Sequence, residues 1–210
     1  MKPIVIAGLG GVGRCVLELI RQINAVQPAW NFAGFVDDSA PPVARGDYLG
    51  PIACMAERTE HHVVVAIGDP KARAKVTARL VALGVRNFPA LVHPTCVHPA
   101  GWMPGEGTII YPGAVIDPDV RVGRFVLINK LCTIGHDAEL NDFVTLSPAV
   151  NIGGRVSVGE GVFFGIRSAT VQNLAIGRHA VVGAGATVLS PVAEGLTVVG
   201  TPARSKQAQR

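Results

Sequence analysis

The sequence repeats with a period of six residues between Ile110 and Val188, which constrains the fold more than any other feature. Counting in steps of six from Ile110 meets an apolar side chain at every position except Thr170. Helices repeat near 3.6 residues and strands near two, so neither explains the pattern. A sustained period of six is typical of a parallel β-helix, in which each hexad supplies one short strand and one corner. The positions are Ile110, Ile116, Val122, Ile128, Ile134, Leu140, Leu146, Ile152, Val158, Phe164, Thr170, Ile176, Val182 and Val188.

Two further positions of each hexad support this prediction. The residue after each apolar one is usually Gly, Asn or Asp, and the residue four after it is small or β-branched. We expect the large side chain to point into the prism and the small one to pack where two walls converge. Because Gly, Asn and Asp tolerate positive φ, we expect the residue after the apolar one to adopt it at the corner.

The first 90 residues show a different pattern, in which apolar runs alternate with helical spacing. The first run leads into a glycine-rich loop, and the last helical segment ends at Gly84. Strands that alternate with helices predict a small parallel α/β domain. We therefore predict a Rossmann-like domain over residues 1–90 and the β-helix over residues 91–210. The strands are expected at 3–7, 32–36 and 63–67, and the helices at 14–23 and 71–83.

The glycine-rich loop carries the first candidate site. Gly8, Gly10 and Gly13 follow the G-x-G-x-x-G spacing between a strand and a helix, where glycines admit a ligand and the helix N-terminus favours an anion. Asp37 and Asp38 end the second strand and can accept hydrogen bonds from a ribose. A nicotinamide dinucleotide is the obvious occupant, but the domain is half the usual size. The alternative is a loop whose glycines only allow tight strand–helix packing.

Composition excludes several classes of function. The net charge is +4, without a basic tract, which argues against a nucleic-acid partner. No run approaches the roughly 18 apolar residues of a membrane span, and we expect no signal peptide at the N-terminus. The four cysteines form no CxxC pair, so zinc-ribbon and redox motifs are absent and no metal is expected. These features predict a soluble cytoplasmic protein, with residues 205–210 as a mobile tail.

Six sequence features span essentially the whole chain: the hexads, the Gly8–Gly13 loop, Phe35-Val-Asp-Asp38, Ala66-Ile-Gly-Asp69, Ile134-Gly-His-Asp137 and Val199-Gly-Thr-Pro-Ala-Arg204. Together they resemble the bacterial hexapeptide-repeat sugar acetyltransferases. This family includes the N-acetyltransferases of nucleotide-linked 4-amino-sugars and the sialic acid O-acetyltransferases. The resemblance implies that the β-helix is left-handed, that acetyl-CoA is the co-substrate, and that a homotrimer places its active sites between subunits.

Acetyl transfer needs a base and a donor to the oxyanion, and the corner after Ile134 offers both. His136 should project outward there, and the resemblance implies that it is the base. Asp137 matches the family's carboxylate partner, but Arg155 lies three hexads later and could pair with Asp137 instead. Gly154 lies eighteen residues after His136, about 4.8 Å away in the next coil, and the resemblance assigns its N–H to the oxyanion. The alternative is a corner glycine needed only for its φ.

The remaining site residues come from the resemblance. Residues implied to contact the cofactor are Thr145, Gly154, Ile166 and Ala184. Residues expected to bind the nucleotide-linked substrate are Gly10, Gly11, Val12, Gly13, Asp37, Asp38 and Gly68. Where some relatives have a second histidine near the acetyl group this chain has Thr145, so a single-histidine mechanism is predicted. Where many relatives have a histidine in the glycine loop this chain has Val12, which removes one polar contact to the nucleotide.

Together these features predict an acetyl-CoA-dependent N-acetyltransferase. Its expected acceptor is the 4-amino group of a UDP- or GDP-linked amino-sugar used in a bacterial glycan, with direct transfer and His136 as the general base. The alternatives are O-acetylation of a sialic acid or similar sugar, a nicotinamide oxidoreductase built on the glycine loop, and a non-catalytic trimeric scaffold. A γ-type carbonic anhydrase needs three metal histidines, and only His136 and His179 lie in the repeats.

Overall fold

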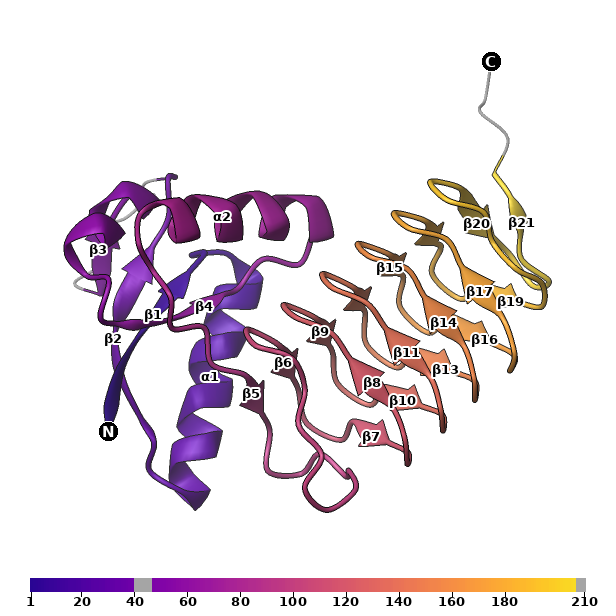
Figure 1. Cartoon of the computed structure of the whole chain (residues 1–210), viewed down its shortest axis with the longest axis horizontal. Helices are drawn as coiled ribbons and strands as arrows, with labels where there is room; N and C mark the ends of the chain where they lie inside the picture. Colours follow the sequence, from indigo (N-terminus) through magenta and orange to yellow (C-terminus); the bar gives the residue numbers. More distant parts are fainter. Residues whose placement is uncertain (40–46, 207–210) are drawn as a thin grey trace. The chain divides into compact units, whose positions relative to one another are not determined.

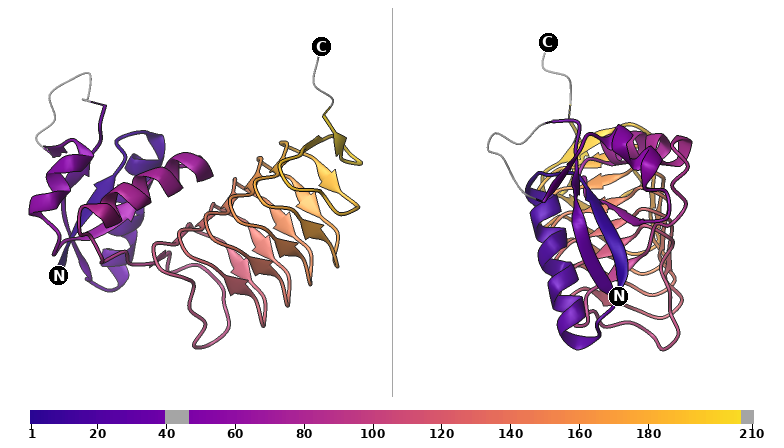
Figure 2. Two further views of the ribbon diagram at one scale, coloured as in Figure 1. Left: turned by 45° about the horizontal axis from the view of Figure 1, so that its top comes forward. Right: turned by 90° about the vertical axis from the view of Figure 1, so that its left-hand side faces the viewer.

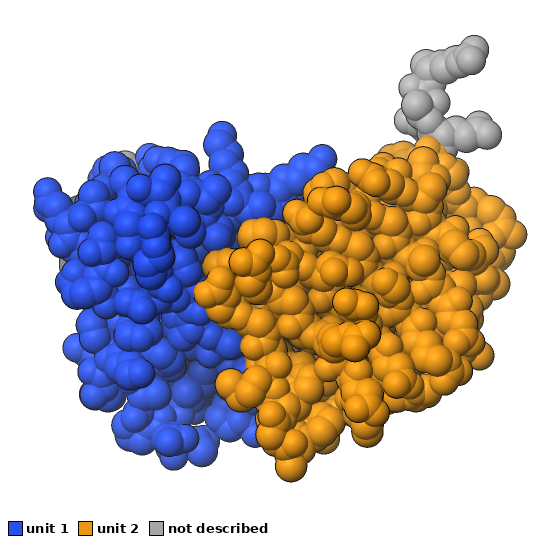
Figure 3. All heavy atoms as spheres, in the orientation of Figure 1, with its two compact units in different colours: residues 1–94 blue, residues 95–210 orange. Residues whose placement is uncertain are grey.

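The computed structural model describes residues 1–39 and 47–206. The chain divides into two compact units, Met1–Pro94 and Thr95–Arg210 (Figure 3); the sequence pattern places the division after residue 90. Of the expected tail at 205–210, Ser205 belongs to strand β21, and residues 207–210 lie outside the described part. No helix within the described ranges is long and apolar enough to cross a membrane.

The first unit is built on a four-stranded parallel sheet in the order β3-β2-β1-β4. Helices α1 and α2 lie on opposite sides of it, as the right-hand view of Figure 2 shows. α1 buries Val16, Leu19 and Ile20 on one stripe, which is why the sequence forms an amphipathic helix there. The elements are β1 (Lys2–Ala7), α1 (Gly11–Val26), β2 (Trp30–Val36), β3 (Tyr48–Gly50), the 3₁₀-helix η1 (Ile52–Glu57), β4 (His62–Val65), α2 (Pro70–Ala82) and β5 (Leu91–Val92).

The predicted strands and helices of this unit are confirmed, with ends that shift by at most three residues. Helix α2 begins where its sequence indicates: the Asp69 side chain accepts a hydrogen bond from the Ala72 N–H at 2.7 Å, and Pro70 occupies the first turn. Gly84 follows the helix with a φ of 96°. The sequence pattern missed β3 and η1, which are short and carry no clear periodicity.

The second unit is a left-handed parallel β-helix whose walls are three parallel sheets (Figure 1). Strand residues pair with the residues eighteen positions away, as Thr133 pairs with Asn151. One wall is β7-β10-β13-β16-β19, the second is β8-β11-β14-β17, and the third contains β6-β9-β12-β15-β18-β20 with β21 antiparallel at its end.

The strands of the β-helix are β6 (Ile109–Ile110), β7 (Val115–Ile116), β8 (Arg121–Val122), β9 (Leu127–Ile128), β10 (Thr133–Ile134), β11 (Glu139–Leu140), β12 (Thr145–Leu146), β13 (Asn151–Ile152), β14 (Ser157–Val158), β15 (Phe163–Phe164), β16 (Ala169–Thr170), β17 (Ala175–Ile176), β18 (Val181–Val182), β19 (Thr187–Val188), β20 (Thr197–Val199) and β21 (Arg204–Ser205).

The six-residue column of apolar residues forms the core of the prism, as predicted. Ile110 and Phe164 are fully buried, and the other members of the column are buried as well. Thr170, the one polar member, is 8% exposed. Its hydroxyl accepts a hydrogen bond from the Gly153 N–H at 3.0 Å, which satisfies the polar group inside the wall.

The prediction that the residue directly after each inward apolar residue has positive φ is wrong. Positive φ occurs three residues after the inward apolar residue, and its carriers include Phe125, Leu131 and Arg155. The glycines directly after the apolar residues are explained by the next coil, whose backbone leaves no room for a Cβ. A Cβ on Gly159 would lie 2.6 Å from the backbone nitrogen of Arg178, and other glycines of this position meet similar contacts. Glycine is therefore selected there for close stacking of coils.

This distinction yields a stability test. We expect Gly159→Ala to lower the free energy of unfolding by about 1–3 kcal/mol, because the added methyl group overpacks the next coil. The control is Ala149→Gly, at a φ of 59°; it should change stability by less than about 1 kcal/mol, since relief of left-handed strain offsets the added freedom of the unfolded chain. Urea unfolding at one fixed protein concentration measures both. Equal losses in the two variants would contradict the stacking explanation.

Candidate active site

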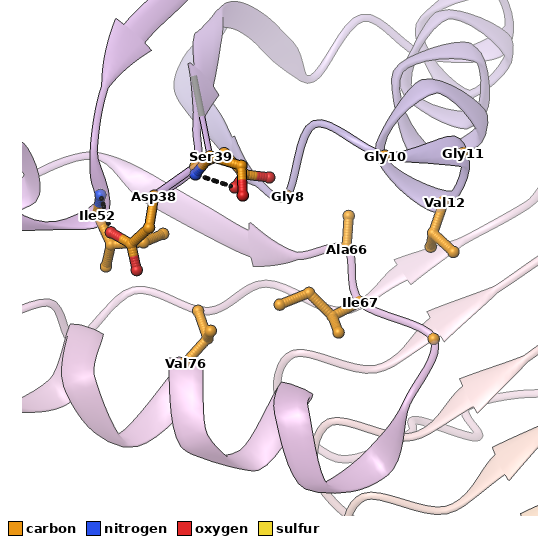
Figure 4. A pocket seen from close by; sticks show the side chains of 12 residues that line it. Gly8, Gly10, Gly11, Val12, Asp38, Ser39, Ile52, Ala66, Ile67 and Val76 are labelled. Carbon is orange, nitrogen blue, oxygen red and sulfur yellow. Dashed lines mark hydrogen bonds between the residues drawn. The ribbon is translucent and has the colours of Figure 1, made fainter. Parts of the chain in front are cut away.

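A pocket of about 460 Å³ opens in the first unit where the carboxyl ends of β1, β2 and β4 meet (Figure 4). The strand order reverses direction between β1 and β4, and ligands of open α/β sheets bind at such switch points. All the residues predicted for the nucleotide except Gly13 line this pocket. Its lining is Gly8, Gly10, Gly11, Val12, Asp37, Asp38, Ser39, Ile52, Ala66, Ile67, Gly68 and Val76.

The three loop glycines do different things. Gly8 has a φ of 115°, which only glycine adopts readily. Gly13 packs against the loop, since a Cβ there would lie 2.0 Å from the Gly8 carbonyl oxygen. A Cβ on Gly10 would have no other atom within 4 Å, and this glycine borders the open pocket. The loop thus combines one glycine needed for its φ, one needed for close packing, and one that leaves room for a ligand.

Asp37 and Asp38 hold the walls of the pocket. The carboxylate of Asp37 accepts hydrogen bonds from the Leu9 N–H at 2.7 Å and the Ser39 N–H at 2.8 Å, which ties β2 to the glycine loop. Asp38 accepts from the Ile52 N–H at 3.2 Å and pairs with Arg79 of α2. The hydrogen bond from Arg79 lowers the pKa of Asp38. Each carboxylate therefore already organises backbone around the site.

A buried arginine that the sequence pattern did not single out supports the same pocket. Arg73 is 1% exposed, and its guanidinium donates to the carbonyl oxygens of Ile67 at 2.6 Å and Gly68 at 3.1 Å. Burial lowers its pKa to about 10, so it stays charged at neutral pH. Its signal in the sequence is its spacing: it shares the buried stripe of α2 with Thr77 and Leu80.

The second candidate site lies in the β-helix, at the edge where the chain turns from β10 into β11. There His136 is half exposed, and its Nδ1 lies 2.8 Å from the Asp137 carboxylate. Because a carboxylate only accepts, Nδ1 donates and Nε2 is left as the basic nitrogen. Arg155 does not pair with Asp137 in this structure; its Nε donates to Asn173 at 2.7 Å instead.

Gly154 lies directly beside the imidazole of His136. A Cβ on Gly154 would be 2.8 Å from His136 Nε2, so no other residue fits without displacing the ring. Gly154 is not among the residues with positive φ, which removes the explanation that the corner needs glycine for its φ. Within the described residues the Gly154 N–H donates to no backbone carbonyl, although the Gly154 carbonyl accepts from the Asn173 N–H. The proximity inferred from the eighteen-residue spacing is thus present.

Of the four residues predicted to contact the cofactor, Gly154 lies at this edge and the other three do not. Ile166, 53% exposed, and Ala184 lie in the turns β15–β16 and β18–β19, at the other edge of the wall that contains β10 and β13. Thr145 is 3% exposed on β12 and keeps its cofactor role only as a prediction. His179 lies at the third edge, where its ring covers Gly161. No cluster of three potential metal ligands occurs among the residues the structure describes.

Comparison with known proteins agrees with this architecture. Residues 3–80 match the model of the PglD N-terminal domain. GDP-perosamine N-acetyltransferase of Escherichia coli O157:H7 is 30% identical over 209 residues, which cover 95% of this chain and 94% of that protein.

Two solved structures share the whole fold. A variant of GDP-perosamine N-acetyltransferase from Caulobacter crescentus, in complex with CoA and GDP-perosamine, has a TM-score of 0.89 at 27% identity and covers 99% of this chain and 98% of that one. The acetyltransferase domain of PglB from Neisseria gonorrhoeae, in complex with acetyl coenzyme A, has a TM-score of 0.87 at 26% identity, covering 98% and 99%. With its α/β unit, its β-helix and this similarity along nearly its full length, the chain belongs to the bacterial hexapeptide-repeat sugar acetyltransferases.

Proposed function

We propose that this enzyme transfers the acetyl group of acetyl-CoA directly to the 4-amino group of a nucleotide-linked amino-sugar. The observation that carries the proposal is the His136–Asp137 pair, whose free Nε2 lies beside the unshielded backbone of Gly154. A full-length relative named for the N-acetylation of GDP-perosamine supports the acceptor class. The nucleotide base and the sugar of this chain's own substrate are what the assay below identifies.

The geometry of His136 suits a general base. Asp137 fixes the ring and its tautomer through Nδ1, so that Nε2 faces outward and can take a proton from the attacking amine. The amine nitrogen forms a bond to the thioester carbonyl carbon, the carbon–sulfur bond breaks, and the thiolate of CoA takes up the proton that His136 received. No covalent enzyme intermediate is needed.

Gly154 suits the second requirement, a donor for the oxyanion. Its N–H lies on the coil next to His136 and donates to no backbone carbonyl of the described residues. A backbone N–H fixed in a rigid coil can stabilise a negative oxygen without reorganising during the reaction. The absence of a side chain leaves room for the imidazole of His136 next to this N–H.

The pocket of the first unit suits a nucleotide diphosphate. The first backbone N–H groups of α1 have no acceptor within the helix. They are therefore available at its N-terminus to bind a phosphate. The sheet has four strands and contains one mononucleotide-binding half, so a sugar nucleotide fits it better than a complete dinucleotide. The complex of the Caulobacter crescentus enzyme with GDP-perosamine supports this assignment.

A site shared between subunits explains why the predicted residues lie on two edges of one prism. His136 and Gly154 occupy one edge, and Ile166 and Ala184 occupy another. In a cyclic trimer, the first edge of one subunit can face the second edge of its neighbour, so that both line one groove for the pantetheine arm. Sedimentation analysis should therefore give three times the monomer mass of 21.9 kDa.

The reaction is tested by release of CoA from acetyl-CoA with a panel of UDP- and GDP-linked 4-amino-sugars, free sialic acid and serine. One amino-sugar should be turned over. His136→Ala should lower kcat by about 10²–10⁴, the usual contribution of a general base. Gly154→Ala should lower it by about 10²–10³, because the methyl group displaces the ring and obstructs the oxyanion site.

The matched control for these variants is His179→Asn, which removes the other histidine of the repeats and should leave kcat unchanged. Turnover of sialic acid in place of every amino-sugar would replace N-acetylation by O-acetylation. Full activity of His136→Ala would exclude His136 as the base. Absence of both turnover and acetyl-CoA binding would favour the trimeric scaffold.

Nucleotide binding is tested with two glycines of the loop, Gly10 and Gly13. Gly10→Ala should fold normally, because no atom lies within 4 Å of the added methyl group. It should weaken binding of the nucleotide-sugar about tenfold, or about 1.4 kcal/mol, because the methyl group projects beside the pocket. Gly13→Ala should destabilise the domain itself. Calorimetric titration and thermal unfolding separate the two effects, and saturable NADH binding to the wild type would revive the oxidoreductase alternative.

A further inference from the structure

Arg155 lies between two possible partners in one column of turn residues. Asp137, Arg155 and Asn173 occupy the same position of three successive coils, each with left-handed backbone at φ values of 60°, 56° and 60°. The guanidinium of Arg155 bonds to Asn173, one coil further on, and leaves Asp137, one coil back, to His136. The hydrogen-bond partner of Arg155 therefore determines whether Asp137 remains bonded to His136.

Other arginines of the β-helix show that both directions are within reach. Arg124 bonds to Asp142, one coil further on, with its guanidinium 2.7 Å from the carboxylate. Arg178 bonds to Glu160, one coil back, also at 2.7 Å. An arginine in these turns, one position before that of Arg155, thus reaches one coil in either direction. Nothing in the length of the side chain keeps Arg155 away from Asp137.

Charge alone would draw Arg155 back toward Asp137. A hydrogen bond to a carboxylate is stronger than one to a neutral amide. Asp119, one coil before Asp137 in the same column, adds a second negative charge on that side. The neutral acceptor Asn173 lies on the opposite side, and its Oδ1 holds the guanidinium there at 2.7 Å.

We propose that Asn173 is a positioning residue for the acetyl transfer: it anchors Arg155 away from Asp137, so that Asp137 remains bonded to His136. This inference rests on the proposed function, because it concerns the same base. Asn173 acts only through Arg155 and Asp137. When the anchor is lost, Arg155 pairs with Asp137, and His136 loses the contact that fixes its ring and tautomer.

The test compares Asn173→Gly with Asn173→Asp. Glycine keeps the left-handed turn without strain and removes the anchor, whereas aspartate keeps an acceptor for Arg155. Asn173→Gly should lower kcat about tenfold, part of the contribution of a general base, with KM for acetyl-CoA unchanged. Asn173→Asp should retain wild-type kcat. Wild-type kcat in Asn173→Gly would overturn the proposal.

A second substitution distinguishes positioning from damage to the coil. In the double variant Asn173→Gly/Arg155→Gln no cation is left to capture Asp137, so kcat should return to within about twofold of the wild-type value, a small difference beside the contribution of a general base. Raising the salt concentration should also restore part of the loss in Asn173→Gly, because exposed ion pairs are screened. A low kcat that neither change rescues would show a structural defect and overturn the proposal.

An activity-independent measurement separates this inference from the proposed function. In ¹⁵N NMR of histidine-labelled protein, the neutral ring of wild-type His136 should carry its proton on Nδ1, where Asp137 accepts it. Asn173→Gly should lose this preference, and the double variant should regain it. If no amino-sugar is turned over by the wild type, the proposed function fails while this spectrum still reports on Asn173. An unchanged tautomer in Asn173→Gly would overturn the inference.

Discussion

The stacking of coils one strand spacing apart, with eighteen residues between equivalent positions, determines almost everything in the second unit. It places Thr133 against Asn151 and repeats that register along each wall. It also fixes which atoms lie behind each turn, so that a Cβ on Gly135 would meet the backbone nitrogen of Gly154 at 2.6 Å. Side-chain identity at a corner is therefore limited by the residue one coil away as much as by local φ and ψ.

This constraint explains what could be predicted of the fold. A repeat turns sequence separation into distance, so the inward column followed from counting alone. The place of the left-handed residue did not, because the conformation belongs to a turn position that tolerates Phe125 and Arg155 as well as glycine. The glycines directly after the inward residues reflect close stacking of the coils and not a requirement for positive φ. In the α/β unit, β3 and η1 could not be predicted because such short elements show too little periodicity in the sequence.

Part of the candidate site could likewise be predicted from the sequence, and part could not. The closeness of His136 and Gly154 followed from the repeat, and the glycine loop followed from its spacing. The partner of Asp137 could not be predicted. His136 is its neighbour in the chain and Arg155 lies one coil away, so both are within reach, and the side-chain rotamers decide between them. Arg73 was missed for a similar reason: an arginine on a helix is usually exposed, and only the tertiary fold shows carbonyl groups that compensate its burial.

Gly154 shows that the candidate site does not depend on an unusual backbone conformation at this position. Among the residues two positions after an inward apolar residue, Gly154 is the one glycine; its equivalents include Pro118, Gln172 and Ala184. The turn itself therefore accepts side chains. Glycine is required at this coil because the ring of His136 fills the space that a Cβ would take. A larger residue at position 154 would therefore displace the imidazole and the basic nitrogen that Asp137 orients.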